Sequence, residues 1–481
     1  MKSNDKYSTK IINFIDNNLT EFNNIINPIL ENIRIDLFND MLALIASTFS
    51  TNYNYNSRSF KLLQIHKVDQ YPLLFIFFCK LYETYTLNND SINNNHVGNT
   101  DKIYCDMSDI CSFPDICNFS KFVKWYRTNQ TVIDFQSIHD YINKLDPNTE
   151  LNNELLDLYK LIYNTKDQRS DLHELLYNNK FVSLDIQHHA ESINLMKTVY
   201  ETKEFNLSIY YPNTGLEYIS DIDKIIHIII FMNNLGKLNN STNIPDICIF
   251  SGLQRKQFSD DDDDNDLCPD NINSGSSVRG KYVKIWRNEE INKVLIHELI
   301  HFHRLDFHSY NDGYNILSDY LINTYNIDGT DSPNESYTET LAVIIHSLFV
   351  SYYHKQSIYE ILRHEMIFTL FQISKILTYF NIVSTNQLGY KTIKQTTSVF
   401  SYFIVKGSFL ISLPLYLDFV KHDIVCLSIE NKVEAFMKLV KLCMNKDYFK
   451  LVDKMIKMLL NINIDYDCFV MKTLRMTCHQ I

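Results

Sequence analysis

The sequence predicts an α+β protein, in which long helices dominate and one small sheet precedes a central helix. The 481 residues include only 10 Gly and 9 Pro, too few for a turn-dense all-β protein. Apolar residues recur at three- and four-residue spacing through most of the chain, which is the helical period. Short β-branched and aromatic runs gather between Phe181 and Trp286, so we expect the sheet there.

The first 165 residues are predicted to form a helical region. Apolar residues follow the helical period between Tyr7 and Tyr85, and again in Leu151–Tyr163. The polar stretch Leu87–Asp101 has no such pattern and is typical of a loop. We therefore expect a helical N-terminal region over residues 1–165.

Residues 166–411 are predicted to combine the sheet with helices, and residues 412–481 to form a helical C-terminal region. The segment Asp221–Leu235 has a helical pattern. Three runs have the composition and length of strands, namely Leu207–Tyr211, Ile247–Phe250 and Tyr282–Trp286. The sheet is therefore expected just before the most specific motif of the chain.

The charge of the chain argues against nucleic acid as a partner. The formal net charge is −12, and the longest charge run, Asp260–Asp264, is acidic. The segment Ser259–Asp270 is typical of a solvated loop, with a calcium site or a surface for basic partners as alternatives. The excess of Asn, Ile, Lys and Tyr resembles proteins of AT-rich genomes, such as those of large DNA viruses.

We expect neither export nor membrane insertion. The opening residues MKSNDKYSTK lack the apolar core of a secretory signal. The apolar runs are shorter than the roughly 20 residues that cross a bilayer, and Lys406 interrupts the candidate Phe400–Leu415. Cys105, Cys111 and Cys117 lack the CxxC pairing of zinc ribbons, which favours reduced thiols. These features predict a cytoplasmic protein, in a host cytoplasm or a virion if the chain is viral, with no membrane partner.

The most specific motif is HELIH at residues 297–301. His297 and His301 are four residues apart on a predicted helix, so both imidazoles project from one face and can bind one metal ion. Glu298 lies beside them and can act as the general base that takes a proton from an activated water. Asn288 is a suitable N-cap for this helix. Residue types and spacing together predict one Zn²⁺ ion and hydrolytic chemistry.

A third protein ligand is expected from SPNESYTE, residues 332–339. Ser332 at the N-cap and Pro333 at the first position predict the start of a second helix. Glu335 can bind zinc, while Glu339, one turn later, can accept a hydrogen bond from a ligand imidazole and fix its tautomer. Two alternatives stay open: Glu335 could instead close a capping box with Ser332, and Glu339 could be the ligand.

HELIH followed by NESYTE resembles the motifs of gluzincin metallopeptidases, which combine an HExxH helix with a later glutamate. The phrase HELIHFHRL is also similar to the motif of clostridial neurotoxin light chains. The resemblance covers about Trp286–Leu348. It implies a zincin-like fold and a zinc-dependent peptidase with a protein or peptide substrate, and it assigns zinc to His297, His301 and Glu335.

The same resemblance implies contacts to the substrate. An edge strand before the active-site helix would pair with a peptide, and Asn271–Lys284 could supply it, because Gly275 permits close backbone approach. Tyr390, Tyr402 and Lys406 are candidates for steadying an oxyanion; the last two share a helical face. The alternative that stays open is a catalytically inactive zinc-binding structural or virion protein.

Overall fold

The computed structural model describes residues 6–33, 35–49, 56–62, 181–192, 195–212, 222–258, 266–306, 312–420, 433–462 and 468–481, and positions 77, 81, 155, 172, 174–177 and 179. The chain divides into two compact units: residues 1–60, 175–190 and 196–481 form the first, and residues 61–174 and 191–195 the second. The described residues belong almost entirely to the first unit. The predicted loop Leu87–Asp101, most of the predicted helix Leu151–Tyr163 and most of the acidic run lie outside the described residues. The predicted boundaries at residues 165 and 411 stay a prediction.

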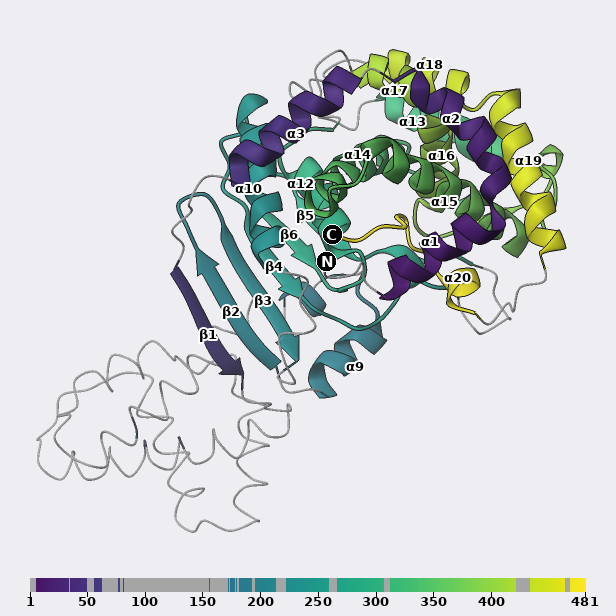
Figure 1. Ribbon diagram of the computed structural model, residues 1–481. Coiled ribbons are helices and arrows are strands. Elements are labelled where there is room, and N and C mark those ends of the chain that lie inside the picture. The colour runs from purple at the N-terminus through teal and green to yellow at the C-terminus, as the bar shows by residue number, and fades with distance from the viewer. Residues whose placement is uncertain are drawn as a thin grey trace, which may run out of the picture. The chain divides into compact units, whose positions relative to one another are not determined.

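The first unit contains a mixed six-stranded sheet in the order β1-β2-β3-β4-β6-β5 (Figure 1). Strand β3 is parallel to β4 and β4 to β6, whereas β5 is antiparallel to β6 and forms the edge. The strands are β1 (Asn56–Leu62), β2 (Leu195–Glu201), β3 (Asn206–Pro212), β4 (Asp246–Phe250), β5 (Gly275–Val278) and β6 (Tyr282–Ile285).

The sequence predicts three of these strands correctly. The predicted strands are confirmed as β3, β4 and β6, and the predicted helix Asp221–Leu235 as α10 (Ile222–Leu238). The helical prediction is wrong at β1, where Asn and Ser disfavour a helix and the segment extends the sheet. The class is therefore α+β, mostly helical with a small mixed sheet.

Three N-terminal helices pack against later helices, as the colours of Figure 1 make clear. Helices α1, α2 and α3 confirm the helical prediction for this stretch. Helices α1 and α2 contact α15, and α3 contacts α10 and α14. The helices of this group are α1 (Lys6–Asn18), α2 (Asn23–Glu31), α3 (Ile35–Phe49), α14 (Asn334–His354) and α15 (Ile358–Tyr379).

Helix α12 (Ile291–Phe302) is the central element of the unit. It packs against α10, α14, β5 and β6, and every residue except His301 is buried, including the polar residues Lys293 and Glu298. The predicted N-cap Asn288 is wrong, because the chain turns at Glu290 in the left-handed conformation (φ 59°). The Glu290 carboxylate instead pairs with Lys256 at 2.8 Å.

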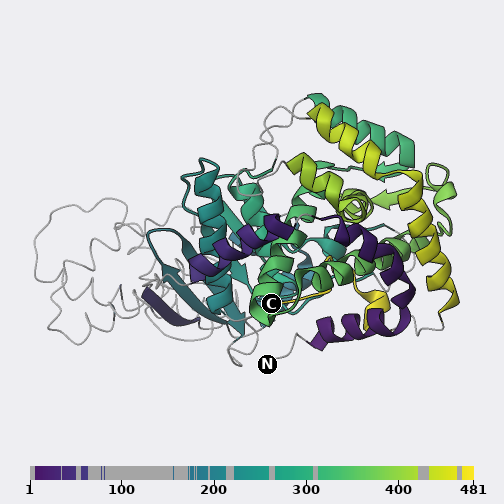
Figure 2. The same ribbon diagram turned by 45° about the horizontal axis from the view of Figure 1, so that its top comes forward.

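The described residues of the C-terminal part form separate helices, of which the last ends at Lys472, and a buried segment without a helix follows. Figure 1 shows this last segment in yellow, running inward from α20. The helical prediction is wrong for residues 473–481, because buried side chains and backbone groups of other elements bind this segment in an extended form. The helices here are α16 (Lys406–Ile411), α17 (Leu413–Val420), α18 (Val433–Cys443), α19 (Lys446–Asn461) and α20 (Phe469–Lys472). Figure 2 shows the helices of this part in light green to yellow.

A small second sheet lies near the start of α14. It pairs β7 (Ile327–Gly329) with β8 (Ile393–Gln395), after α13 (Asp312–Tyr325). Among the described helices, none alone has the length and apolar character to span a membrane. The pair Phe400–Ile411 and Leu413–Val420 meets that test only together and bends by 96°.

Candidate metal centre

Helix α12 presents two imidazoles to one point. His297 and His301 lie one turn apart, and their Nε2 atoms are 3.2 Å from each other. Their side chains are 9% and 16% exposed, so the point between them lies at the margin of the core. The apolar residues of α12 fill the other faces of the helix, which fixes the direction of these two rings.

Helix α14 brings a carboxylate to the same point. Glu335 Oε2 lies 3.3 Å from His297 Nε2 and 3.4 Å from His301 Nε2. The alternative capping box does not form, because the Ser332 backbone N–H donates to the Ser398 hydroxyl at 3.0 Å instead. The helix begins at Asn334, one residue after the predicted start. The structure therefore brings His297, His301 and Glu335 together, a set of side chains that could hold a metal ion.

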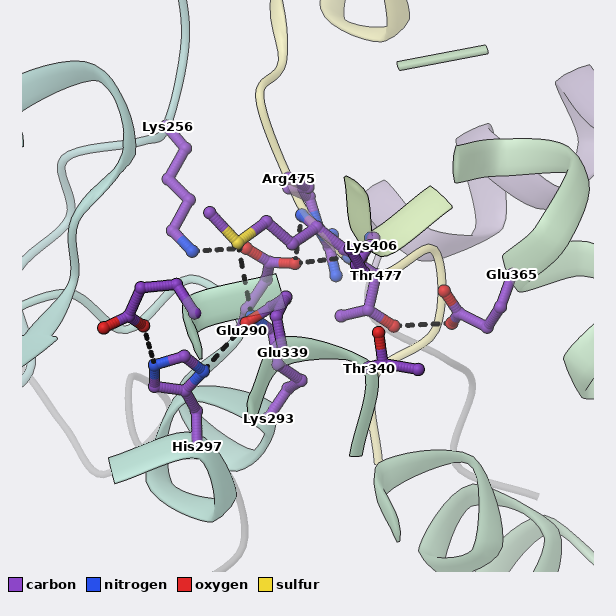
Figure 3. Close-up of polar contacts among 12 residues, drawn as sticks. Lys256, Glu290, Lys293, His297, Glu339, Thr340, Glu365, Lys406, Arg475 and Thr477 are labelled. Atoms are coloured by element: carbon purple, nitrogen blue, oxygen red, sulfur yellow. Dashed lines mark hydrogen bonds and ion pairs between the residues drawn. The ribbon is translucent and has the colours of Figure 1, made fainter. Parts of the chain in front are cut away.

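The outer ring nitrogen of each imidazole faces a carboxylate. His297 Nδ1 lies 2.9 Å from Glu339 Oε2, and His301 Nδ1 lies 2.6 Å from Asp306 Oδ2. An Nδ1–H that donates to a carboxylate leaves the Nε2 lone pair free to bind a metal. Glu339 therefore orients the His297 ring. Its other carboxylate oxygen accepts a hydrogen bond from Lys293 Nζ at 2.5 Å (Figure 3).

The three inner atoms have the spacing that zinc requires. The two Nε2 atoms and one carboxylate oxygen lie 3.2 to 3.4 Å from one another, so they can share protons through hydrogen bonds or bind one cation among them. Zinc bonds of about 2.0 to 2.1 Å in tetrahedral geometry place ligand atoms about 3.3 Å apart. We call His297, His301 and Glu335 the HELIH cluster.

The charges of the site shift each other's pKa. Burial alone would lower the pKa of His301, but Glu335 and Asp306 outweigh it and hold that pKa well above its ordinary value. Burial alone would raise the pKa of Glu335, but His301 and the hydrogen bonds of both histidines hold it well below its ordinary value. Glu339 has a lowered pKa as well, because Lys293 and His297 outweigh its burial. The two glutamates therefore stay ionised and attract positive charge.

Glu298 lies beside the HELIH cluster and lines a cavity with His297, Gly275 and Tyr402. Its Oε2 accepts a hydrogen bond from the Ser277 hydroxyl at 2.8 Å. Burial raises the pKa of Glu298, against the opposite effect of the two histidines. A carboxylate with a raised pKa holds a proton more readily, as a general base near neutral pH must.

The edge strand β5 approaches Glu298 closely. A methyl group at Gly275 would lie 2.8 Å from Glu298 Oε1 and 2.9 Å from Val294 Cγ1, so only glycine leaves room for the carboxylate. Ser277, two residues after Gly275, donates a hydrogen bond to the Glu298 carboxylate. The predicted segment Asn271–Lys284 thus contains an edge strand that lies against the site.

The three oxyanion candidates lie in different places. Tyr402 lines the cavity and hydrogen-bonds to Glu335; it belongs to a π-helical turn, Phe400–Val405, a geometry frequent at functional sites. Lys406 is not brought to the cavity, because its Nζ donates to the Met476 carbonyl at 3.2 Å. Tyr390 is 87% exposed and does not line the cavity.

Asp331 connects the start of α14 to the π-helical turn. Its carboxylate accepts from the Ser401 hydroxyl at 2.6 Å and from the Gln395 side chain at 3.2 Å. Burial raises its pKa to about 6, against the lowering effect of these hydrogen bonds. The hydrogen bond between Asp331 and Ser401 links the start of α14, which carries Glu335, to the π-helical turn, which carries Tyr402.

Sequence reasoning missed Asp306, Ser277 and Lys293. Asp306 follows His301 by five residues, beyond the last helical residue, so helical spacing gives no signal for it. Ser277 lies in a strand too short to predict well, and Lys293 looks like a surface residue although it is 2% exposed. His303, one residue beyond α12, is buried, and its ring nitrogens lie at hydrogen-bond distance from Asn233 and Ser241.

Comparisons with protein-family models, curated proteins and solved structures find no significant match to this chain. The site therefore rests on its own residues and their geometry.

Proposed function

We propose that this chain is a zinc-dependent peptidase. The observation that carries the proposal is the set of three possible ligand atoms that lie 3.2 to 3.4 Å apart in the HELIH cluster. Its spacing suits tetrahedral zinc, and two outer carboxylates orient the imidazoles for binding. Three protein ligands leave a fourth position for water or substrate, which is typical of catalytic zinc sites.

The bound ion would polarise a carbonyl and lower the pKa of a water molecule. Glu298 would take a proton from that water and deliver it to the leaving amine. The Ser277 hydroxyl holds the Glu298 carboxylate in place through its 2.8 Å hydrogen bond. The Tyr402 hydroxyl is protonated because burial raises its pKa well above the ordinary value. It would donate to an oxyanion at the cavity after leaving its present hydrogen bond to Glu335.

A peptide is the substrate class that the site suits best. The edge strand β5 lies beside Glu298 and can pair with an extended chain through its free edge. The cavity lies between this strand and Tyr402. These features support a peptide that runs along β5 with its scissile bond at the HELIH cluster.

The test is the substitution Glu298→Gln, which keeps the shape of the side chain and removes the base. Cleavage of a proteome-derived peptide library, followed by mass spectrometry, should fall about 10³-fold, while zinc content stays at the parent level. Glu360→Gln, at a side chain 54% exposed on α15, is the matched control and should cleave normally.

Two results would overturn the proposal. The first is a Glu298→Gln variant that cleaves as fast as the parent. The second is a zinc-loaded parent that cleaves no peptide in the library, which would favour the inactive zinc-binding structural protein.

A further inference from the structure

The C-terminal segment is an unusual part of the core. Residues 473–481 run through the interior in extended form, and Thr477, Cys478 and His479 are at most 2% exposed. Glu365 of α15 accepts a hydrogen bond from the Thr477 hydroxyl at 2.5 Å (Figure 3). It also accepts from the backbone N–H groups of Cys478 and His479 at 3.2 and 3.3 Å. The segment is therefore held at one buried carboxylate.

Three potential ligand atoms converge at this carboxylate. A Glu365 oxygen, the Cys478 Sγ and a His479 ring nitrogen all lie within 4.8 Å of one another. Neither ring nitrogen of His479 has a hydrogen-bond partner among the described residues, although the side chain is buried. Leaving two buried polar atoms unsatisfied costs free energy, so a ligand that takes one of them would stabilise the fold.

We propose that Glu365, Cys478 and His479, the tail cluster, bind a second zinc ion that fastens the C-terminal segment to α15. Thiolate, imidazole and carboxylate are all zinc ligands, and the thiolate disfavours magnesium and calcium. Tetrahedral zinc needs ligand atoms about 3.3 to 3.6 Å apart, which small rotations of Cys478 and His479 can reach. Binding releases the Cys478 proton to solvent, because the thiolate is the ligand.

The surroundings of the tail cluster favour a structural zinc ion over a catalytic one. All three side chains are at most 2% exposed, and none of them lines the cavity beside Glu298. A carboxylate and a thiolate balance the two charges of the ion, so a buried complex would be neutral overall. Closed sites with cysteine ligands are typical of structural zinc.

The test is metal content together with cobalt substitution. The parent protein should hold two zinc ions per chain by elemental analysis, and Cys478→Ser should hold one. After exchange for Co²⁺, the parent should show a thiolate-to-cobalt charge-transfer band in the near ultraviolet. The HELIH cluster has no cysteine, and the tail cluster is the one group of possible metal ligands with a cysteine among the described residues, so loss of the band in Cys478→Ser assigns it to the tail cluster.

Matched variants separate this inference from the proposed peptidase. Cys443→Ser, at a buried thiol elsewhere, should keep both zinc ions and the band. His301→Ala should lose one zinc ion and keep the band. A parent with no band after cobalt loading, or a band that survives Cys478→Ser, would overturn the second site. The parent measurement alone decides the first of these, even if a variant does not fold.

Discussion

The HELIH cluster and the tail cluster use similar side chains in opposite surroundings. In the HELIH cluster the ligands are 9 to 16% exposed and adjoin a cavity. In the tail cluster no residue is more than 2% exposed. The comparison teaches that two clusters of possible metal ligands can differ in solvent access, and this difference underlies our proposal of turnover at one and a structural ion at the other.

The two clusters also differ in what lies behind the ligands. Carboxylates of Glu339 and Asp306 face the imidazoles of the HELIH cluster. In the tail cluster, backbone N–H groups face Glu365, and the His479 ring nitrogens face no partner among the described residues. Acidic partners raise the pKa of an imidazole, as in His301, whereas burial lowers the pKa of His479.

The largest effect is expected where the edge strand meets the base. In Gly275→Ala the new methyl group would lie 2.8 Å from Glu298 Oε1, so the carboxylate must move. A displacement of about 1 Å can cost about 10²-fold in turnover. We expect kcat for library peptides to fall about 10²-fold, while zinc content at both clusters stays unchanged.

Ser276→Ala is the control for this strand. Ser276 follows Gly275 and points to the other face of the sheet, where its hydroxyl accepts from Asn179 at 3.0 Å. Cleavage near the parent rate is expected. Equal losses in the two variants would mean that the strand, and not the room beside Glu298, limits the reaction.

A smaller effect is expected from removing one outer carboxylate. Asp306→Asn keeps the shape of the side chain but weakens the contact to His301 Nδ1, now 2.6 Å. Loss of such a partner typically lowers metal affinity 10- to 100-fold. Competition with a zinc chelator should show that one zinc ion per chain binds more weakly than in the parent. In the cobalt-loaded variant, the cobalt–thiolate band of the tail cluster should stay intact.

Asp328→Asn, at an exposed position of β7, is the matched control. Its zinc affinity should equal that of the parent. If Asp306→Asn also retained the parent affinity, Asp306 would not orient the HELIH cluster. The outer carboxylates would then no longer distinguish the HELIH cluster from the tail cluster.

The parts of the fold that the sequence predicts depend on local pattern. The helices α10 and α12 and the strands β3, β4 and β6 follow from periodicity and composition over a few turns. The conjunction of Glu335 with HELIH follows from a motif spacing, because two helices that both carry metal ligands must meet.

The parts that the sequence did not predict depend on distant contacts. Glu290 precedes α12 in a left-handed turn because its carboxylate binds the backbone of Met476 and Thr477, 186 and 187 residues away. Cys478 and His479 meet Glu365 only because the last segment enters the core. No local pattern contains such information, since each partner lies more than 100 residues from the other.

The last prediction concerns a buried histidine that lacks a close acidic partner. Burial lowers the pKa of His346 to about 3; Lys293 and Arg475 add to this effect, and Glu290 opposes it. The unfolded state, with a pKa near 6.5, therefore binds more protons between pH 6.5 and about 3. The stability that neutral His346 contributes is present above pH 6.5 and is lost as the pH falls through this window.

Between pH 7 and pH 5 this loss amounts to about 2 kcal/mol for one such group. Urea unfolding of chelator-treated protein at both pH values should show that His346→Gln reduces the pH difference in unfolding free energy by about that amount. His188→Gln, at an exposed position, should leave the difference unchanged. A pH difference as large in His346→Gln as in the parent would mean that neighbouring acids, as at His301, stabilise protonated His346 despite its burial.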